Sequence, residues 1–450
     1  MRLISYLKYL LLAAALGISI IELFTTARLG PNPAVMVADI EAESSADPTF
    51  LTVYAGKLYF NAADRAHHWE LWQYDAAKGT TTLVADINPD GSSDPLFLTV
   101  YAGQLYFEAD DGTHGNQLWH FDSATDALSW IDGINPNGDS KPWDLTVYND
   151  LLYFSADDGT HGRELWRYDA ASGKTTLAAD INPDGDSYPA NLTVYDNRLY
   201  FGADDGTSGW ELWRYNSTTG TAELAADINL QGDSYPNNLT VYADRLFFQA
   251  SAATETAQQL WSYDAANKAL TFILDVEPFG FSVDIQLTVY DGQLYFSGDD
   301  GIHGQELWRY DSASNTAELV VDINPGSAGS YPSSFIIFNG QLYFSTDDGK
   351  YGSELWHYDS TINKAELVAD INPKSYSNPG EFTIYNDQLY FSAEDENRNR
   401  ELWMYDPNSP DTGKYRYEFD KYNISDVVFS ALLLAVVIIA DIRKKGQSKQ

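Results

Sequence analysis

Residues 162–189 read GRELWRYDAASGKTTLAADINPDGDSYP, and this stretch decides the fold together with the run ANLTVYDNRLYFGADDGTSG that follows it. Its tryptophan, Trp166, has counterparts along the whole chain at a spacing of 47 or 48 residues. The tryptophans in this register are Trp72, Trp119, Trp166, Trp213, Trp261, Trp308, Trp356 and Trp403. A fixed period of this length is typical of repeat architectures, so the sequence predicts eight copies of one structural unit.

Each unit contains four short runs with the character of β-strands. LTVY and LYF are rich in β-branched and aromatic residues, ELWRY alternates charged and apolar residues, and ELAADI or ELVADI is again apolar. Clusters of Gly, Asn, Asp and Pro bound every run, which leaves no room for helices of about 10 to 12 residues. A four-stranded sheet that is apolar on both faces must stack against its neighbours, and a ring of such sheets is a β-propeller.

The two ends of the repeat favour a closed ring over an open solenoid. The first ADI-type run, VMVADI at residues 35–40, comes before any complete unit, whereas the last set of strands at residues 382–406 has no such run after it. An N-terminal strand would therefore complete the last sheet. We predict an all-β fold, an eight-bladed β-propeller of four-stranded blades over residues 34–406, closed by the N-terminal strand; an open solenoid gives no reason for the complementary deficit.

The ELW triplet, the ADINP turn and the DDGTHG loop resemble the repeats of the ELWxxDGT family of secreted and surface proteins. The resemblance covers residues 35–406, which is 372 of 450 residues. The chain departs from the family after the tryptophan, because Asp169 is followed by Ala170 and Asp311 by Ser312 in place of the family's DGT. The resemblance implies a propeller, but no established activity and no catalytic residues to transfer.

Composition narrows the classes of function. The 65 acidic residues exceed the 27 basic residues by 38, which argues against a nucleic-acid partner because phosphates need positive charge. The chain contains no cysteine, which excludes disulfides, a thiol nucleophile and a thiolate metal site. An extracytoplasmic protein of this composition must be held together by packing, and closure of the ring offers the means.

The N-terminal residues, 1–33, have the pattern of a secretory signal. Arg2 and Lys8 precede an apolar run of 13 residues at 9–21, and small residues follow it. This pattern fits a cleaved signal peptide, and it also fits an uncleaved signal anchor whose apolar run continues further.

The C-terminal part has the pattern of a membrane anchor. A polar linker at residues 407–423 precedes an apolar stretch at 424–442, whose 19 residues would extend about 28 Å as a helix. The basic tail at residues 443–450 marks the cytoplasmic side. The sequence therefore predicts a transmembrane helix with a basic cytoplasmic tail, and a propeller displayed outside the membrane at the cell surface.

The strand order places the DDGTHG and NPDGDSYP loops on one acidic face of the propeller. Five of these loops carry paired acids before a glycine, and oxygen-rich, flexible loops suit weak Ca²⁺ binding. Turn chemistry alone explains the same residues, because Asp and Gly are favoured in hairpin loops and no D-x-D-x-D spacing is present. The candidate Ca²⁺ ligands are Asp110, Asp111, Asp157, Asp158, Asp204, Asp205, Asp299, Asp300, Asp347 and Asp348.

Other side chains of this face have two interpretations each. His114, His161 and His303 recur at one loop position, which indicates a turn role rather than catalysis. Aromatic residues beside or near proline in the inter-blade loops could stack on sugar rings or a protein partner, or pack over the blade edge. They are Trp143, Tyr188, Tyr235, Tyr331 and Tyr376.

These features together favour a binding protein over an enzyme. We expect a membrane-tethered, outward-facing propeller that serves as a non-catalytic binding or adhesion scaffold, with a protein or glycan ligand on the acidic loop face. One alternative is a calcium-binding structural surface protein. An extracytoplasmic hydrolase is the other, because two of the 65 acids could face one another across the channel.

Overall fold

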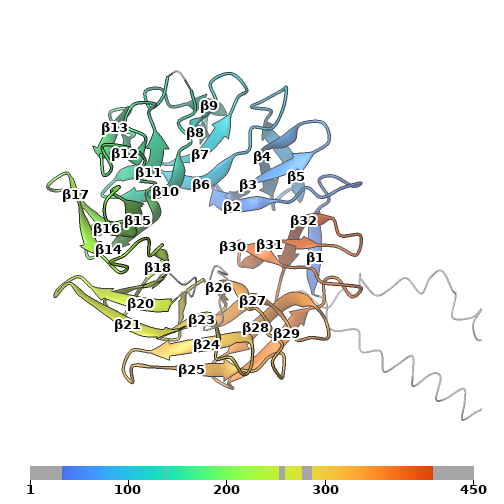
Figure 1. The fold of residues 1–450 in the computed structure, drawn as a ribbon. Coiled ribbons are helices and arrows are strands. Elements are labelled where there is room, and N and C mark those ends of the chain that lie inside the picture. Colours follow the sequence, from blue (N-terminus) through green and yellow to red (C-terminus); the bar gives the residue numbers. More distant parts are fainter. Residues whose placement is uncertain (1–32, 137, 253–258, 276–285, 409–450) are drawn as a thin grey trace, which may run out of the picture. The chain divides into compact units, whose positions relative to one another are not determined.

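A computed structural model of the protein arranges the repeats as eight separate four-stranded antiparallel sheets around a common centre (Figure 1). The structure describes residues 33–136, 138–252, 259–275 and 286–408. The predicted eight-bladed β-propeller of four-stranded blades is confirmed. We number the blades 1 to 8 in chain order.

Blades 1 to 7 run from the innermost to the outermost strand in sequence order, and blade 8 does so for its first three strands. The innermost strands are β2 (Thr49–Tyr54), β6 (Leu96–Tyr101), β10 (Trp143–Tyr148), β14 (Ala190–Tyr195), β18 (Asn237–Tyr242), β22 (Thr288–Tyr290), β26 (Ser333–Phe338) and β30 (Gly380–Tyr385). The second strands are β3 (Lys57–Asp64), β7 (Gln104–Asp110), β11 (Leu151–Asp157), β15 (Arg198–Asp204), β19 (Arg245–Ala250), β23 (Gln293–Asp299), β27 (Gln341–Asp347) and β31 (Gln388–Glu394).

The outer half of each blade carries the ELW strand and its partner. The third strands are β4 (His68–Asp75), β8 (Asn116–Asp122), β12 (Arg163–Asp169), β16 (Trp210–Asn216), β20 (Gln259–Asp264), β24 (Gln305–Asp311), β28 (Ser353–Asp359) and β32 (Arg400–Tyr405). The outermost strands are β5 (Thr80–Ala85), β9 (Ala127–Trp130), β13 (Lys174–Ala179), β17 (Thr221–Ala226), β21 (Ala269–Asp275), β25 (Thr316–Val321), β29 (Lys364–Ala369) and, in blade 8, β1 (Ala34–Ala38).

The apolar residues of the second and third strands form the cores between blades. Five consecutive residues of β11 are buried, which is possible only because a neighbouring blade covers each face of the sheet. Trp166 of blade 3 shares a core cluster with Tyr101 and Leu118 of blade 2. The repeated tryptophan of blade 3 therefore lies in the core between two blades.

The N-terminal strand closes the ring, as the sequence predicted. Strand β1 pairs with β32 in antiparallel register, with Met36 opposite Trp403. The backbone N–H of Ala46 also donates to the carbonyl of Arg400 at 3.1 Å. Blade 8 thus combines strands from both ends of the repeat region, and closure depends on hydrogen bonds and packing alone.

A buried glutamate in the ELW triplet holds the loop that leads to the next blade. In blade 3, one carboxylate oxygen of Glu164 accepts the N–H of Ile181 at 2.6 Å and the hydroxyl of Ser187 at 2.7 Å. Burial raises the pKa of Glu164 to about 7. The glutamates with this role are Glu70, Glu164, Glu211, Glu306, Glu354 and Glu401. They hold the inter-blade loops in one conformation around the ring.

Two of the predicted elements lie outside the described residues. These are the signal or anchor segment and the transmembrane helix at residues 424–442. In the part of the chain that the structure describes, no helix has the length and apolar character that a membrane crossing requires.

Candidate functional site

The two kinds of acidic loop lie side by side on one face, which we call the loop face. The N–H of Asp110, at the start of a DDGTHG loop, donates to the carbonyl of Ser93 in the inter-blade loop at 2.9 Å. The same contact joins Asp157 to Ser140 in the next blade at 2.9 Å. The predicted grouping of these loops on one face is confirmed, and the innermost strands begin at this face.

Near its start, each long innermost strand contains a β-bulge. In blade 1 the register of β2 with β3 shifts between Thr49 and Thr52. The bulge contains Phe50, whose φ is 56°. A bulge turns the side chain of the extra residue away from the regular alternation of the strand. In seven blades one residue is thereby presented at the mouth of the central channel, and in blade 6 Gln286, just before β22, takes the equivalent place.

These channel-mouth residues differ from blade to blade, whereas the strand that follows them is nearly uniform. In blade order the mouth residues are Phe50, Phe97, Asp144, Asn191, Asn238, Gln286, Ser334 and Glu381. Deeper in the innermost strands the repeat presents the same type of side chain each time, an exposed valine or isoleucine in most blades, for example Val53, Val100 and Ile384. The innermost strands therefore repeat one pattern around the ring, whereas the mouth has mixed chemistry.

The backbone at the mouth disfavours several of the residues found there. Asn191 and Asp144 have φ values of 60° and 59°, a left-handed conformation that Asn and Asp tolerate. Phe97 and Glu381 have φ values of 59° and 57°, where side chains of their type are strained by about 1–2 kcal/mol. Backbone preference alone does not explain a phenylalanine or a glutamate at this position, which points to a role of the side chain itself.

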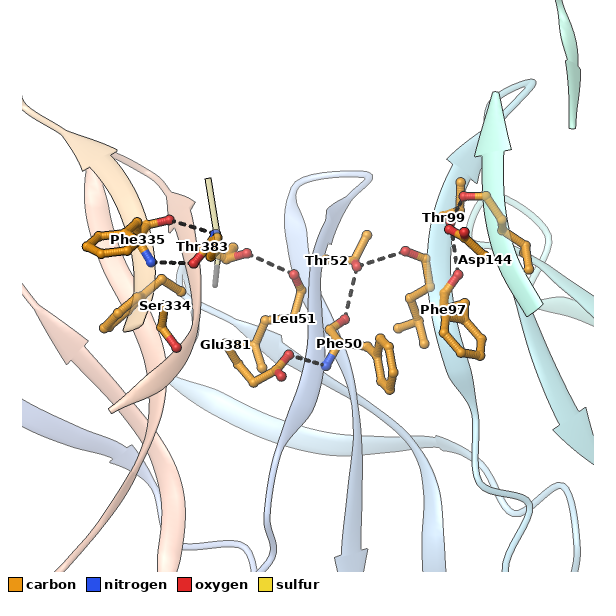
Figure 2. Close-up of a pocket in the computed structure, with 14 residues that line it drawn as sticks. Phe50, Leu51, Thr52, Phe97, Thr99, Asp144, Ser334, Phe335, Glu381 and Thr383 are labelled. Atoms are coloured by element: carbon orange, nitrogen blue, oxygen red, sulfur yellow. Dashed lines mark hydrogen bonds between the residues drawn. The ribbon is translucent and has the colours of Figure 1, made fainter. Parts of the chain in front are cut away.

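A cavity opens between the mouth residues. It measures about 390 Å³ and is lined by residues of blades 1, 2, 3, 6, 7 and 8. A second hollow of about 280 Å³ continues along the innermost strands of blades 3 to 6. Figure 2 shows the lining of the first cavity, with Phe50 and Phe97 between Glu381 on one side and Asp144 on the other.

One side of the mouth is an aromatic wall, formed by Phe50, Phe97 and Trp143. The rings of Phe50 and Phe97 meet edge to face with centroids 5.2 Å apart, and the rings of Phe97 and Trp143 lie 4.8 Å apart. Trp143 is half exposed, with 50% of its surface accessible. The wall therefore crosses blades 1 to 3; Phe50 and Phe97 line the cavity, and Trp143 adds exposed ring surface beside them.

A carboxylate stands at each end of the aromatic wall. One oxygen of Glu381 accepts the N–H of Phe50 at 2.7 Å, and one oxygen of Asp144 accepts the N–H of Leu192 at 2.7 Å. Desolvation by the surrounding blades raises the pKa of both groups. The effect is present at Glu381 although solvent in the channel reaches its side chain, because the wall of the channel lies close around it.

Hydrogen bonds between neighbouring innermost strands make the mouth a rigid frame. The hydroxyl of Thr52 donates to the carbonyl of Leu98 in the next blade at 3.1 Å, and that of Thr383 donates to Leu51 across the closure at 2.8 Å. In blade 6 the amide of Gln286 bonds both the N–H and the carbonyl of Phe335, at 2.5 Å and 3.2 Å. A preformed frame of this kind keeps the mouth residues at fixed distances from one another.

The predicted Ca²⁺ ligands shape their own loops. In the first such loop, Asp110 accepts the N–H of Gly112 at 2.7 Å, and Asp111 accepts the N–H groups of Thr113 and His114 at 2.9 Å and 2.8 Å. The same bonds recur in the loops of the other four pairs, at Asp157 and Asp158, Asp204 and Asp205, Asp299 and Asp300, and Asp347 and Asp348. Among the residues of the chain that the structure describes, no group of three or more His, Asp or Glu side chains lies close enough together to hold a metal ion.

The loop histidines belong to the same turns. The ring nitrogen Nδ1 of His161 lies 2.7 Å from a carboxylate oxygen of Asp158, and His114 and His303 repeat the contact with Asp111 and Asp300. The bond to Asp158 raises the pKa of His161. A turn role for these histidines, as the sequence predicted, accounts for their contacts.

The inter-blade aromatic residues are exposed on the loop face rather than buried against it. Tyr188 and Tyr235 are 47% and 48% exposed, and their rings flank that of Trp210 at centroid distances of 6.4 Å and 5.5 Å. Tyr331 and Tyr376 are 60% and 38% exposed. Of the two interpretations of these residues, the geometry favours an exposed surface that a ligand can reach.

Comparison with solved structures places the fold among known propellers. A structure described as the Dos1 propeller aligns with 84% of this chain and 95% of its own at 14% identity, with a TM-score of 0.52. A chain from an analysis of two prolyl endopeptidases aligns at 12% identity with a TM-score of 0.49. The alignment covers 80% of this protein but only 54% of the endopeptidase chain. An oligogalacturonate lyase in complex with manganese aligns over 82% of this chain and 92% of its own at 12% identity, with a TM-score of 0.45. At these identities the likeness shows the fold alone.

Sequence comparison identifies the family. No curated protein sequence matches the chain. A family model described as outer membrane protein assembly factor BamB matches residues 103–412, which is 310 of 450 residues. The matched region begins just before the second strand of blade 2, β7, and ends beyond the last strand of blade 8, β32. The protein therefore belongs to the family described as outer membrane protein assembly factor BamB.

Proposed function

We propose that the protein is a membrane-tethered, outward-facing scaffold without catalytic activity that binds a partner protein on its loop face. One observation carries the proposal. The positions that build the blades repeat almost unchanged, whereas the channel-mouth residues differ from blade to blade and include strained side chains such as Phe97 and Glu381. A ring with a purely structural role would not require different side chains at the channel mouth of each blade, whereas a binding site carried by a rigid scaffold does.

The family supports a protein as the partner. Its description names an assembly factor for outer membrane proteins, and a factor of that kind acts by binding other proteins. The exposed aromatic residues of the loop face agree with this proposal, because tyrosine and tryptophan are enriched in the energetically dominant parts of protein interfaces. The resemblance to ELWxxDGT repeat proteins also implies a location at the cell surface.

The membrane tether rests on the sequence of residues 424–442 and the basic tail after it. Its test compares the full chain with a chain that ends at Asn408, expressed in the same cells. After alkaline carbonate extraction, we expect the full chain in the membrane pellet and the shortened chain in the soluble fraction. A shortened chain that stays in the pellet would assign the anchor to the N-terminal segment instead.

The absence of cysteine allows a direct test of binding by the loop face. A single cysteine replaces Asp184, in an exposed inter-blade loop of that face, or Ala171, in the exposed turn between β12 and β13 on the opposite face. Each variant carries a photoactivatable crosslinker on this cysteine and is irradiated in membranes of the source organism. We expect a discrete crosslinked protein from Asp184→Cys and not from Ala171→Cys. Equal crosslinking from both faces, or none from either, contradicts the proposed function.

A further inference from the structure

The channel mouth combines two phenylalanines of the aromatic wall, Phe50 and Phe97, with two carboxylates in one cavity. The wall of Phe50, Phe97 and Trp143 is continuous through ring contacts of 5.2 Å and 4.8 Å. Glu381 of blade 8 precedes this wall in the ring and Asp144 of blade 3 follows it, and Figure 2 shows the two phenylalanine rings between these carboxylates. The four mouth residues belong to consecutive blades across the point where the ring closes.

In the described part of the chain, neither carboxylate forms a close ion pair, although the positive charge of Arg400 acts on Glu381 and lowers its pKa against the larger effect of burial. Among the residues that the structure describes, no ion pair involves Asp144 or Glu381. Arg400 lies near Glu381, but its guanidinium donates to the hydroxyl of Ser392 at 2.7 Å and to the carbonyl of Asn378 at 2.8 Å. Within the described residues, Asp144 has no ion-pair partner and Glu381 feels Arg400 only at a distance, so a cationic ligand that pairs with either carboxylate would favour its ionised form.

The chemistry of this wall selects a cation that carries apolar surface. Aromatic faces attract cations such as Lys and Arg side chains, most strongly where water is excluded. A desolvated carboxylate gains more from a positive partner than a solvated one does. Inorganic cations lack the apolar part that would use the rings, and a neutral or acidic ligand would leave both carboxylates unpaired.

We propose that the channel mouth binds a basic side chain, lysine or arginine, of the partner protein. Its aliphatic stem lies against Phe50 and Phe97, and its charged head reaches one of the two carboxylates that flank them. This inference rests on the proposed function, because it assigns the chemistry by which the loop face recognises its partner. The cation also neutralises part of the net charge of −38, so association is faster at low ionic strength.

The test uses the full chain in detergent micelles and short peptides as probes. Acetyl-Gly-Arg-Gly-amide and its lysine counterpart are compared with the peptide that carries citrulline, which keeps the shape of arginine without the charge. Saturation-transfer NMR and calorimetric titration measure their affinities. We expect both basic peptides to bind, and the citrulline peptide to bind about tenfold more weakly, the effect of one charge-assisted contact.

The repeat itself supplies variants that fit the strained backbone. Phe97→Asn and Asp144→Asn introduce the residue that blades 4 and 5 carry at the same position, Asn191 and Asn238. Each variant should bind the arginine peptide about five- to tenfold more weakly than the unchanged protein does. Asp150→Asn removes one charge from the exposed turn between β10 and β11 on the opposite face, and its affinity should equal that of the unchanged protein. Melting temperatures verify that all three variants are folded.

Three results overturn the inference. The first is an equal affinity for the arginine and citrulline peptides. The second is an affinity of Asp144→Asn for the arginine peptide that equals that of the unchanged protein. The third is binding of tetramethylammonium as tight as that of the arginine peptide, which would assign the mouth to a small free cation. The crosslinking test keeps the two proposals apart. A partner that still crosslinks from Asp184→Cys when Phe97→Asn and Asp144→Asn are added refutes the basic side chain and leaves the scaffold function in place.

Discussion

Replacement of Glu164 tests whether the buried glutamates hold the inter-blade loops, and with them the channel mouth. At pH 8, above its pKa of about 7, the carboxylate is ionised and accepts the N–H groups of Ile181 at 2.6 Å and Asn182 at 3.3 Å. The hydroxyl of Ser187 also donates to it, but that hydroxyl keeps a second acceptor, the carbonyl of Arg163 at 3.2 Å. Glu164→Ala therefore leaves two buried N–H groups without a partner.

The size of the effect follows from these two bonds. A buried donor without a partner costs about 1–3 kcal/mol, and the bond to Asn182 is long, so we expect a loss of about 2–4 kcal/mol in the free energy of unfolding. Residues 34–408 form one unit of 375 residues, whose unfolding entropy is about 0.8 kcal/mol/K at the usual value per residue. The melting temperature should therefore fall by about 3–5 °C.

The stability of Glu164→Gln should lie between that of the unchanged protein and that of Glu164→Ala, with a loss of about 1–2 kcal/mol in the free energy of unfolding. Its amide keeps one oxygen as an acceptor, but its own N–H groups face the N–H groups of the loop. Blade 2 shows what a glutamine needs at this position. The amide of Gln117 donates to the carbonyls of His114 at 2.8 Å and Gly138 at 2.7 Å. In blade 3 the carboxylate instead receives backbone N–H groups.

Differential scanning calorimetry at pH 8 measures these changes, with Glu318→Ala as the matched control. Glu318 is an exposed glutamate that pairs with Arg309 at the surface, and such a pair contributes about 0–1 kcal/mol. A Glu164→Ala protein that melts within about 1 °C of the unchanged protein would refute the reasoning, because the loop would then be held by its other contacts.

Three further predictions concern calcium, pH and closure. The calcium hypothesis predicts that Ca²⁺ raises the melting temperature of the full chain more than Mg²⁺ does. The double variant Asp157→Asn, Asp158→Asn should show a smaller rise. An equal response to both ions would leave the paired acids with their turn role alone. Burial raises the pKa of Glu164 to about 7 and that of Glu354 to about 8, so the folded state holds protons that the unfolded chain releases. Their contribution to stability is complete below about pH 4.5 and is lost as the pH rises to 7–8; the melting temperature should fall over this window, and less steeply in the glutamine variants. A chain without residues 34–38 should melt lower and over a broader range, and a synthetic peptide of residues 33–40 should restore the transition, because β1 completes blade 8 through hydrogen bonds and packing. No effect of the peptide would mean that the ring does not depend on this strand.

Much of the molecule follows from the sequence of a single repeat. The alternation in ELWRY and the apolar run LYF determine strands that are buried on both faces, because only stacking against identical neighbours removes this surface from water. The surplus strand at residues 35–40 and the missing strand after Asp406 determine how the ring closes. These are local or periodic properties, and a pattern of hydrophobic residues records them directly.

The role of the ELW glutamate was not evident from the pattern. Glu164 reads as the polar residue of an alternating strand, and polar residues of such strands usually face solvent. The structure places it at the end of β12, where the inter-blade loop folds over it and supplies its hydrogen-bond partners 17 to 23 residues away. Three-dimensional loop packing, rather than strand periodicity, decides that this carboxylate is buried.

The sequence by itself determined the number of blades, their four-stranded form, the closing strand and the acidic face, because each depends on period and patterning. Only the tertiary structure decided the candidate site. The residue before each LTVY-type run carried a signal, since it changes among Phe, Asp, Asn, Gln, Ser and Glu while the run after it hardly changes, but nothing in the strand pattern indicates that a bulge turns it into the channel. Glu381 and Phe50 are 331 residues apart and are joined by one hydrogen bond of 2.7 Å across the closure. Neighbours of this kind exist only once the ring has closed, so the physical chemistry of the mouth belongs to the folded ring.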